Sequence, residues 1–367
     1  MLKIDFAKRK FIKIIPMLLA SACLFLTGCE GGSEDTKAVA DDNILYVYNW
    51  DEYIADGVIE MFEEETGYKV VYDVFDTNES LYAKLASGDI AYDVICPSDY
   101  MIAKMAANDM LAEIDYSAIP NYQYIGEKYI ESSKAFDPQN KYSVPYTWGT
   151  VGILYNTKMV DEEVNSWSIL FDEKYRHNIV MLDSVRDSYA VALKYLGYSL
   201  NTLDEKELAE ATELLMKQKP LLQAYEVDYA RERMINGSAA LAVIYSGEAL
   251  YSQWENEDLA YAVPDEGSNI WIDSWVIPKN AEHKEAALAW IDFMCRPDIA
   301  KMNLEYITYS TPNSAVYDML DDEELKESDT LFPDESVTER CEAFSYLGEE
   351  GDKYYSNLWE DVKAAAN

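Results

Sequence analysis

Trp271 and Asp273, a tryptophan and an aspartate two residues apart, have the residue types and the spacing to bind an organic cation. They lie in residues 269–278, an apolar run with strand-like composition that ends at a proline. Because side chains alternate along a strand, the indole ring and the carboxylate should share one face. The ring offers its π face and the carboxylate its charge to an ammonium group. Taken alone, however, the pair is better explained as a core tryptophan beside a strand-end aspartate.

Aromatic, acidic and hydroxyl side chains also follow other predicted strands. In open parallel sheets, ligands collect beyond the carboxyl ends of the strands. The side chains at these predicted ends are Trp50, Asp51, Tyr53, Ser98, Tyr100, Ser184, Asp187, Tyr245, Trp271 and Asp273. Each has a structural explanation, such as helix capping by Asp51 or the helix-start position of Asp187. Their coincidence at five strand ends, where Arg186 is the exceptional cation, favours a small, positively charged, partly apolar ligand.

The segments that must position these residues alternate between strand and helix patterns. The predicted strands are residues 44–48, 68–74, 92–96, 178–182 and 239–245, and helices are predicted at 79–86, 101–108, 183–196, 203–218 and 282–295. This alternation predicts an α/β fold whose parallel sheet is covered on both faces. An ordered chain of about 325 residues exceeds one typical domain core, so two lobes are expected.

Two connections need separate mention. Residues 49–52 are expected to turn directly into a helix that Asn49 or Asp51 caps and that ends at Gly67. Residues 142–148 and 150–155 are expected to form two short extended segments joined near Gly149.

The amino terminus has the pattern of an export signal. Residues 1–28 carry five lysines and arginines followed by an apolar stretch, residues 14–26. That stretch is shorter than the roughly 20 residues of a membrane span. The sequence Leu-Thr-Gly-Cys that ends at Cys29 resembles the bacterial lipobox, which implies cleavage before Cys29 and lipid attachment to its thiol. A plain secretory signal and an uncleaved anchor are the alternatives.

The mature chain is therefore expected outside the cytoplasm, lipid-anchored at a cell surface or on the periplasmic side. Residues 29–42 are polar and are predicted to be a flexible tether. Loss of residues 1–28, which hold five Lys/Arg and one Asp, changes the formal charge from −38 to −42. Such an acidic chain is unsuited to nucleic acid and to anionic lipid surfaces.

Residues for metal binding or catalysis are scarce in the sequence. Beyond Cys29 the cysteines are Cys96, Cys295 and Cys341, with no CxxC spacing, which fits neither a disulfide framework nor a zinc site. Two histidines, His177 and His283, argue against His-based metal binding and triad chemistry. No motif of a nucleophile elbow, a P-loop or a zinc protease stands out. We therefore expect a binding protein without a cofactor or metal rather than an enzyme.

Several motifs resemble the spermidine/putrescine-binding proteins of polyamine ABC importers. Residues 45–53 (Leu-Tyr-Val-Tyr-Asn-Trp-Asp-Glu-Tyr) are similar to the opening of that family, and the similarity extends over nearly all of the chain from Asn43. The other similar motifs are residues 91–94, 97–100, 142–149, 271–274, 309–313 and 332–334. The resemblance implies a two-lobed periplasmic-binding-protein type II fold, with lobes joined by crossing segments, a polyamine in the cleft between them, and delivery to a membrane permease.

The resemblance also implies lobe boundaries and a set of binding residues. The first lobe is expected at 43–148 and 272–317, and the second at 149–271 and 318–367, which includes C-terminal helices. The residues that match the family's types are Trp50, Tyr53, Ser98, Tyr100, Trp271, Asp273 and Tyr309. The departures are Asp51 for threonine, Asp187 for glutamate, Ser184 for aspartate, Tyr245 for tryptophan and Glu342 for glutamine.

The expected mechanism is electrostatic and aromatic. Asp273 and Asp187 should each take an amine, Trp271, Trp50 and Tyr245 should enclose the methylene chain, and the remaining residues should supply acceptors. Losing a carboxylate at 184 while gaining them at 51 and 342 could relocate an amine subsite, so the preferred polyamine stays open. A sugar or ferric-ion binder on the same fold, a glycosidase and a ligand-free scaffold are the alternatives.

Overall fold

The computed structural model describes residues 43–365 except positions 89 and 228. The predicted signal, the tether and Cys29 lie outside these described residues. None of the helices in this described part has the length and apolar composition to cross a bilayer.

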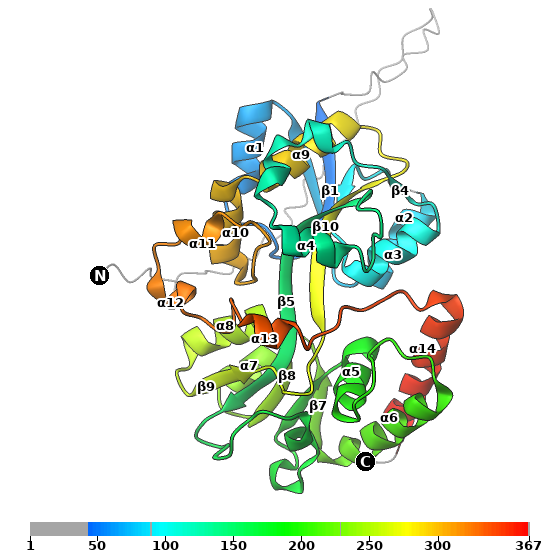
Figure 1. The fold of residues 1–367 in the computed structure, drawn as a ribbon, viewed down its shortest axis with the longest axis vertical. Coiled ribbons are helices and arrows are strands. Elements are labelled where there is room, and N and C mark those ends of the chain that lie inside the picture. Colours follow the sequence, from blue (N-terminus) through cyan, green and yellow to red (C-terminus); the bar gives the residue numbers. More distant parts are fainter. Residues whose placement is uncertain (1–42, 89, 228, 366–367) are drawn as a thin grey trace, which may run out of the picture. The chain divides into compact units, whose positions relative to one another are not determined.

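One mixed β-sheet runs through the described chain (Figure 1). Its strand order is β2-β1-β3-β10-β5-β8-β6-β7, with β4 beside β10 and β9 beside β5. The strands are β1 (Ile44–Trp50), β2 (Lys69–Phe75), β3 (Val94–Ile95), β4 (Leu111–Ala112), β5 (Ser143–Asn156), β6 (Ile179–Leu182), β7 (Leu222–Glu226), β8 (Leu241–Tyr245), β9 (Leu259–Ala262) and β10 (Ile270–Pro278). The α/β fold class is confirmed, and β1 does pair in parallel with β2 and β3.

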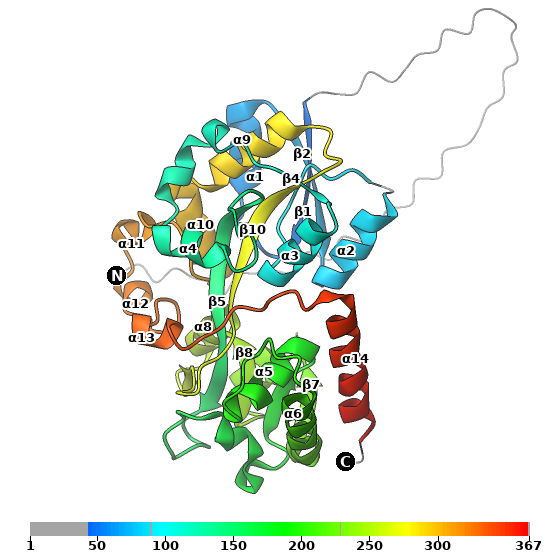
Figure 2. The same cartoon turned by 45° about the vertical axis from the view of Figure 1, so that its right-hand side comes forward.

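The prediction of a parallel sheet is wrong at the centre, where β10 runs antiparallel to both β3 and β5. The cause is that β5 and β10 pass in opposite directions between the two halves of the sheet (Figure 2). β5 is also one continuous 14-residue strand, so the expected break near Gly149 is wrong. Gly149 instead pairs with Trp271 inside the ladder.

Helices cover the faces of the sheet in both halves (Figure 1). They are α1 (Val58–Thr66), α2 (Asn78–Ser87), α3 (Asp99–Ala107), α4 (Glu127–Ser133), α5 (Val185–Tyr195), α6 (Glu205–Gln218), α7 (Ala230–Ile235), α8 (Ser246–Glu255), α9 (Lys284–Met294), α10 (Pro297–Ile307), α11 (Val316–Met319), α12 (Glu323–Lys326), α13 (Glu335–Thr338) and α14 (Gly348–Ala364). The expected cap by Asn49 or Asp51 is wrong, because α1 begins only after Gly57. The predicted stop at Gly67 is confirmed, since this residue adopts the left-handed conformation that favours glycine.

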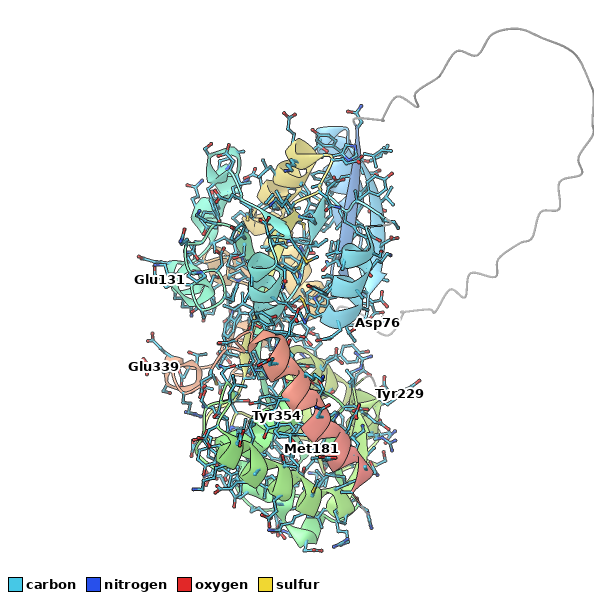
Figure 3. The ribbon with its side chains drawn as sticks, turned by 90° about the vertical axis from the view of Figure 1, so that its right-hand side faces the viewer. Asp76, Glu131, Met181, Tyr229, Glu339 and Tyr354 are labelled. Atoms are coloured by element: carbon cyan, nitrogen blue, oxygen red, sulfur yellow. The ribbon has the colours of Figure 1, made fainter. Side chains whose placement is uncertain are left out.

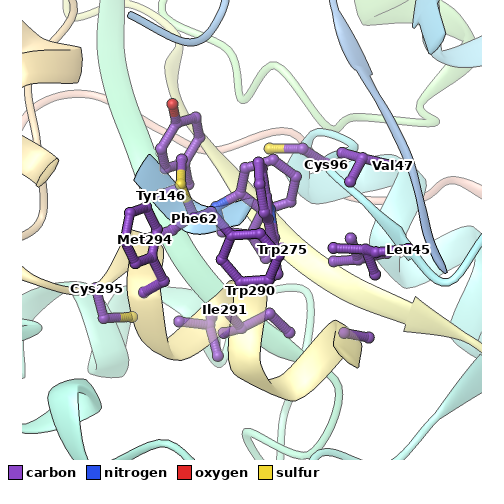
Figure 4. Close-up of a cluster of buried hydrophobic side chains, with 14 of the residues drawn as sticks. Leu45, Val47, Phe62, Cys96, Tyr146, Trp275, Trp290, Ile291, Met294 and Cys295 are labelled. Atoms are coloured by element: carbon purple, nitrogen blue, oxygen red, sulfur yellow. The ribbon is translucent and has the colours of Figure 1, made fainter. Parts of the chain in front are cut away.

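The two lobes have separate hydrophobic cores that meet along β5 and β10. In the first lobe, Tyr146 of β5 and Trp275 of β10 pack with Trp290 of α9, and the two indole rings lie 5.8 Å apart (Figure 4). Val151 of β5 and Trp271 of β10 belong to the core of the second lobe. Two of the predicted lobe boundaries fall within β5 and β10. They stay a prediction.

The C-terminal helix α14 packs against α5 and α6. Its Tyr355 and Trp359 pack with residues of α5 and α6 in one buried cluster, which includes Tyr189. Figure 3 shows this helix, which carries Tyr354, lying along the lobe that contains Met181. Lys104 of α3 reaches Asp352 of α14 with an Nζ–Oδ2 distance of 3.3 Å.

Candidate functional site

Asp273 lies where β10 leaves one core and enters the other. Ile272 packs in a first-lobe cluster while Trp271 packs in the second-lobe core, so these two neighbouring side chains lie on opposite faces of β10, as predicted. The Asp273 side chain is buried, and its Oδ2 accepts a 2.7 Å hydrogen bond from the Tyr53 hydroxyl. Its Oδ1 is buried and has no hydrogen-bond partner. One oxygen of a buried carboxylate is thus left for a donor that the chain does not supply.

Asp187 has the same arrangement in the second lobe. It lies in the first turn of α5, and its Oδ2 accepts hydrogen bonds from Ser184 at 2.6 Å and from the Tyr245 hydroxyl at 3.0 Å. Ser184 caps α5, so one side chain both starts the helix and orients the carboxylate. The Asp187 Oδ1 is buried without a partner, as in Asp273.

A chain of aromatic contacts joins these two carboxylates. The ring of Tyr245 meets Trp271 at 6.3 Å, Trp271 meets Tyr309 at 4.9 Å, and both pairs are T-shaped. Tyr309 lies 6.0 Å from Tyr53, whose hydroxyl holds Asp273. The Trp271 indole is therefore a middle member of a chain of aromatic rings that has Asp187 at one end and Asp273 at the other.

Burial sets the electrostatics of both carboxylates. Desolvation raises the pKa of Asp273 to about 6, although the nearby Ser98 and Tyr53 hydroxyls oppose the shift. Desolvation also raises the pKa of Asp187, although its hydrogen bonds with Ser184 and Tyr245 oppose the shift. Charge at these positions is costly without a cation, so an incoming ammonium group would relieve that cost.

Affinity for a cationic ligand should rise between about pH 5 and pH 7, because protonated Asp273 cannot pair with an ammonium group. The pKa of Asp273 in the folded protein lies above its usual value of 3.8. Protonation of Asp273 therefore stabilises the ligand-free protein, and this contribution is complete below pH 3.8. This stabilisation is lost as the pH rises through about 6. Titration calorimetry across this range checks the expectation, and an affinity that falls or stays constant would contradict it.

Three further predicted residues lie around this arrangement on the first lobe. Trp50 packs against Phe75 at 4.5 Å, and its indole nitrogen is buried without an acceptor. Ser98 accepts a hydrogen bond from Asn78, and its backbone forms a β-bridge with Asp273. The Tyr100 hydroxyl donates to Glu79, and its ring packs against a cluster formed by Ala190, Leu200 and Phe344. Tyr100 thereby contacts residues of both lobes.

The structure places two predicted residues differently. The Asp51 side chain is exposed, and the hydrogen bond recorded for it comes from the adjacent Glu52 amide. Glu342 pairs beside β10 through its backbone, but its carboxylate forms an ion pair with Lys194 and accepts a hydrogen bond from Ser199 at 2.6 Å. The carboxylates of Asp51 and Glu342 therefore do not lie free among the buried site residues.

Sequence reasoning missed several residues that shape the site. Asp99, at the start of α3, is buried, and its desolvation together with the charge of Asp273 raises its pKa to about 8. A Cβ at Gly149 would lie 2.6 Å from the Trp271 ring, and a Cβ at Gly247 would lie 2.5 Å from the Tyr309 ring. The sequence signal for Asp99 was its place at a strand end, whereas nothing in the sequence marks these glycines as close ring contacts.

Two of the cavities in the described structure border mostly residues outside this arrangement, although the smaller one reaches Tyr53. The larger, about 520 Å³, is lined by residues such as Glu162, Ser166 and Tyr195, and the smaller, about 190 Å³, by residues such as Glu52 and Tyr53. Neither borders Asp273 or Asp187, because these carboxylates are enclosed by protein. We regard the enclosed pair as the site, since its unpartnered oxygens indicate a ligand more directly than surface concavity does. Within the described residues, no three His, Cys, Asp or Glu side chains are grouped to hold a metal ion.

Comparisons with known proteins show the family of the chain. The family model for bacterial extracellular solute-binding proteins matches residues 57–333. The chain is 37% identical over 327 residues to a spermidine/putrescine-binding periplasmic protein of Salmonella typhimurium, covering 89% of this chain and 93% of that protein. It is 38% identical over 326 residues to the protein of that name in Escherichia coli, covering 88% and 92% of the two chains.

A solved structure is also similar over most of its length. A spermidine/putrescine ABC transporter substrate-binding protein from Streptococcus pneumoniae superposes with a TM-score of 0.80 at 40% identity. The alignment covers 88% of this chain and 98% of that one.

Proposed function

Because the chain belongs to the family of bacterial extracellular solute-binding proteins, we propose that it is the extracytoplasmic substrate-binding component of an ABC importer for polyamines, spermidine or putrescine. The family serves transport, so the protein is not an enzyme. The observation that carries the ligand class is the pair of buried carboxylates, Asp187 and Asp273, each with one unpartnered oxygen. A neutral sugar would leave both charges buried and uncompensated.

Polyamine recognition follows from this chemistry. Alkyl ammonium groups resemble lysine, with a pKa near 10.4, so they stay charged at neutral pH. One ammonium group donates to Asp273 and another to Asp187, while the methylene chain lies against Trp271, with Trp50 and Tyr245 beside it. Each well-placed cation–π contact adds about 0.5–2 kcal/mol. Tyr53, Ser98, Tyr100 and Tyr309 position these groups.

Ligand entry requires movement of the lobes. Asp187 and Asp273 are only 5% and 4% exposed, so an amine reaches them when the lobes separate. We place the hinge within β5 and β10, with residues 43–148 and 272–317 in one lobe and 149–271 and 318–367 in the other. The contacts of Tyr100 with Phe344 and of Lys104 with Asp352 form on closure. The closed protein then presents one shape to the permease subunits.

The location of the protein follows from its amino terminus. We propose that residues 1–28 direct export and that lipid on Cys29 holds the protein to the membrane, with residues 29–42 as a tether. This arrangement keeps the binding lobes near the permease while they open and close. Mass spectrometry of the membrane-extracted protein tests it, since a Cys29→Ala variant should lose the diacylglycerol mass and leave the membrane fraction.

A thermal-shift series tests the ligand class directly. Putrescine, cadaverine, spermidine and spermine should raise the melting temperature, because a ligand that binds the folded state alone stabilises it by about 2.7 kcal/mol at 100 times its Kd. Sugars and Fe(III) should cause no shift. A shift with a sugar or Fe(III) and none with any amine would contradict the proposal.

A further inference from the structure

Asn269, the residue before β10, is a buried polar side chain outside the set of predicted binding residues. Only 2% of it is exposed, and its Oδ1 has no hydrogen-bond partner among the described residues. The buried indole nitrogen of Trp271 also lacks a partner in this part of the chain, so these two groups do not satisfy each other. Because an unsatisfied buried acceptor costs free energy, this amide oxygen indicates a donor that the chain does not supply.

The register of the sheet places Asn269 in the row of side chains next to Asp187. The Val151 amide donates to the Asn269 carbonyl oxygen at 3.1 Å, and Val151 pairs with Tyr245 on its other side. Residues directly opposite each other in antiparallel strands point to the same face, so Asn269, Val151 and Tyr245 lie abreast across β10, β5 and β8. The Tyr245 hydroxyl donates to Asp187 at 3.0 Å. Asn269 therefore faces the Asp187 end of the aromatic chain.

The Asn269 amide also acts on the Asp187 carboxylate itself. Desolvation raises the pKa of Asp187, and hydrogen bonding by Ser184, Tyr245 and, as a smaller effect, Asn269 opposes this shift. The amide nitrogen is the donor in that interaction, so the amide oxygen lies next to a carboxylate whose Oδ1 is itself buried without a partner among the described residues. Asp187 and Asn269 thus form a pair of neighbouring acceptors, one charged and one neutral.

The backbone around Asn269 is held on both sides. Glu342, in the connection between α13 and α14, donates its amide to the Ser268 carbonyl oxygen at 2.9 Å and accepts from the Ile270 amide at 3.0 Å (Figure 2). The Glu342 carboxylate pairs with Lys194 of α5, so this connection is itself anchored. Because its backbone is fixed before any ligand arrives, the Asn269 amide is ordered at little cost on binding.

An alkyl ammonium group has the donors that these two acceptors lack. One N–H bonds to Asp187, and a neutral amide oxygen takes another without adding a buried charge. Building on the proposed function, we infer that Asn269 determines specificity, because its amide oxygen accepts a hydrogen bond from the ammonium group at Asp187. It selects amines that carry at least two N–H groups on that nitrogen over dialkylated ones. A site built to bond an N–H group rejects an analogue without it, since its own acceptor stays unpaired.

Titration calorimetry of the wild-type protein with putrescine and with tetramethylputrescine tests this selectivity. Tetramethylputrescine has the same methylene chain and remains a dication, but each of its nitrogens keeps a single N–H. Putrescine should bind at least about tenfold more tightly, the effect expected for one hydrogen bond to a charged group. A smaller preference would overturn the inference while leaving the polyamine function intact. If neither amine binds, and spermidine does not bind either, the proposed function itself fails.

Substitutions at position 269 test the role of the amide oxygen. Asn269→Leu has a similar size and no acceptor, so the preference for putrescine over tetramethylputrescine should fall at least about threefold. Asn269→Asp is the matched control, since it keeps an acceptor of the same shape and should keep the wild-type preference. A purely structural role, or an oxygen that only holds water, would change both affinities alike. A wild-type preference in Asn269→Leu, or equal preferences in the two variants, would therefore overturn the inference, and the wild-type comparison stands where a variant fails to fold.

Discussion

The substitution Asp273→Asn should weaken polyamine binding by at least tenfold. Removing one member of a buried ion pair typically costs about 3–5 kcal/mol, and 1.4 kcal/mol corresponds to tenfold in affinity. Asparagine keeps the shape and can still accept from Tyr53, so the lost quantity is the charge opposite the ammonium group. Titration calorimetry measures it, and an unchanged Kd for putrescine and spermidine would contradict the assignment of Asp273.

The same substitution should not destabilise the ligand-free protein. Burial raises the pKa of Asp273 to about 6, so its charge at neutral pH opposes folding. Asp93→Asn is the matched control. Asp93 is also buried, but its oxygens accept hydrogen bonds from the amides of Tyr46, Glu282 and His283. Its substitution should lower the melting temperature and leave the affinity of the folded protein unchanged, which is the opposite pattern.

Gly247→Ala should also reduce affinity at least tenfold, although residue 247 has no functional group. The new Cβ would lie 2.5 Å from two atoms of the Tyr309 ring, so the ring must move. Tyr309 packs against Trp271 at 4.9 Å and against Tyr53 at 6.0 Å, and its displacement disturbs both. Overpacking of this kind costs about 1–3 kcal/mol, so the melting temperature should fall by a few degrees as well.

Gly126→Ala is the control for Gly247→Ala. A Cβ at Gly126 would lie 3.3 Å from the nearest atom of Tyr129, a contact that a small shift relieves. This variant should keep the wild-type affinity. If Gly247→Ala binds polyamine as the wild type does, then the position of Tyr309 does not control binding.

The local pattern of the sequence predicted the strands that carry the site. The period of two predicts that Trp271 and Ile272 point to opposite faces of their strand, and the structure confirms it because the two side chains pack in different clusters. The strand-to-helix junction at Ser184 and Asp187 was also predictable, since serine is a favoured helix cap. These features depend on neighbours within a few residues.

Contacts between distant residues could not be predicted in this way. Tyr53 and Asp273 are 220 positions apart, and Glu342 and Lys194 are 148 apart, so no local pattern pairs them. The sequence therefore left Glu342 as a candidate amine ligand, while the structure gives its carboxylate to a lysine. The antiparallel centre of the sheet has the same origin, because it arises where two distant strands, β5 and β10, meet.

A crystal structure of the protein with putrescine tests the central claim most directly. One nitrogen of the diamine should lie within hydrogen-bond distance of Asp273 Oδ1 and the other within that distance of Asp187 Oδ1, with the methylene chain against Trp271. Putrescine bound elsewhere on the acidic surface, with both Oδ1 atoms still unpartnered, would contradict the account.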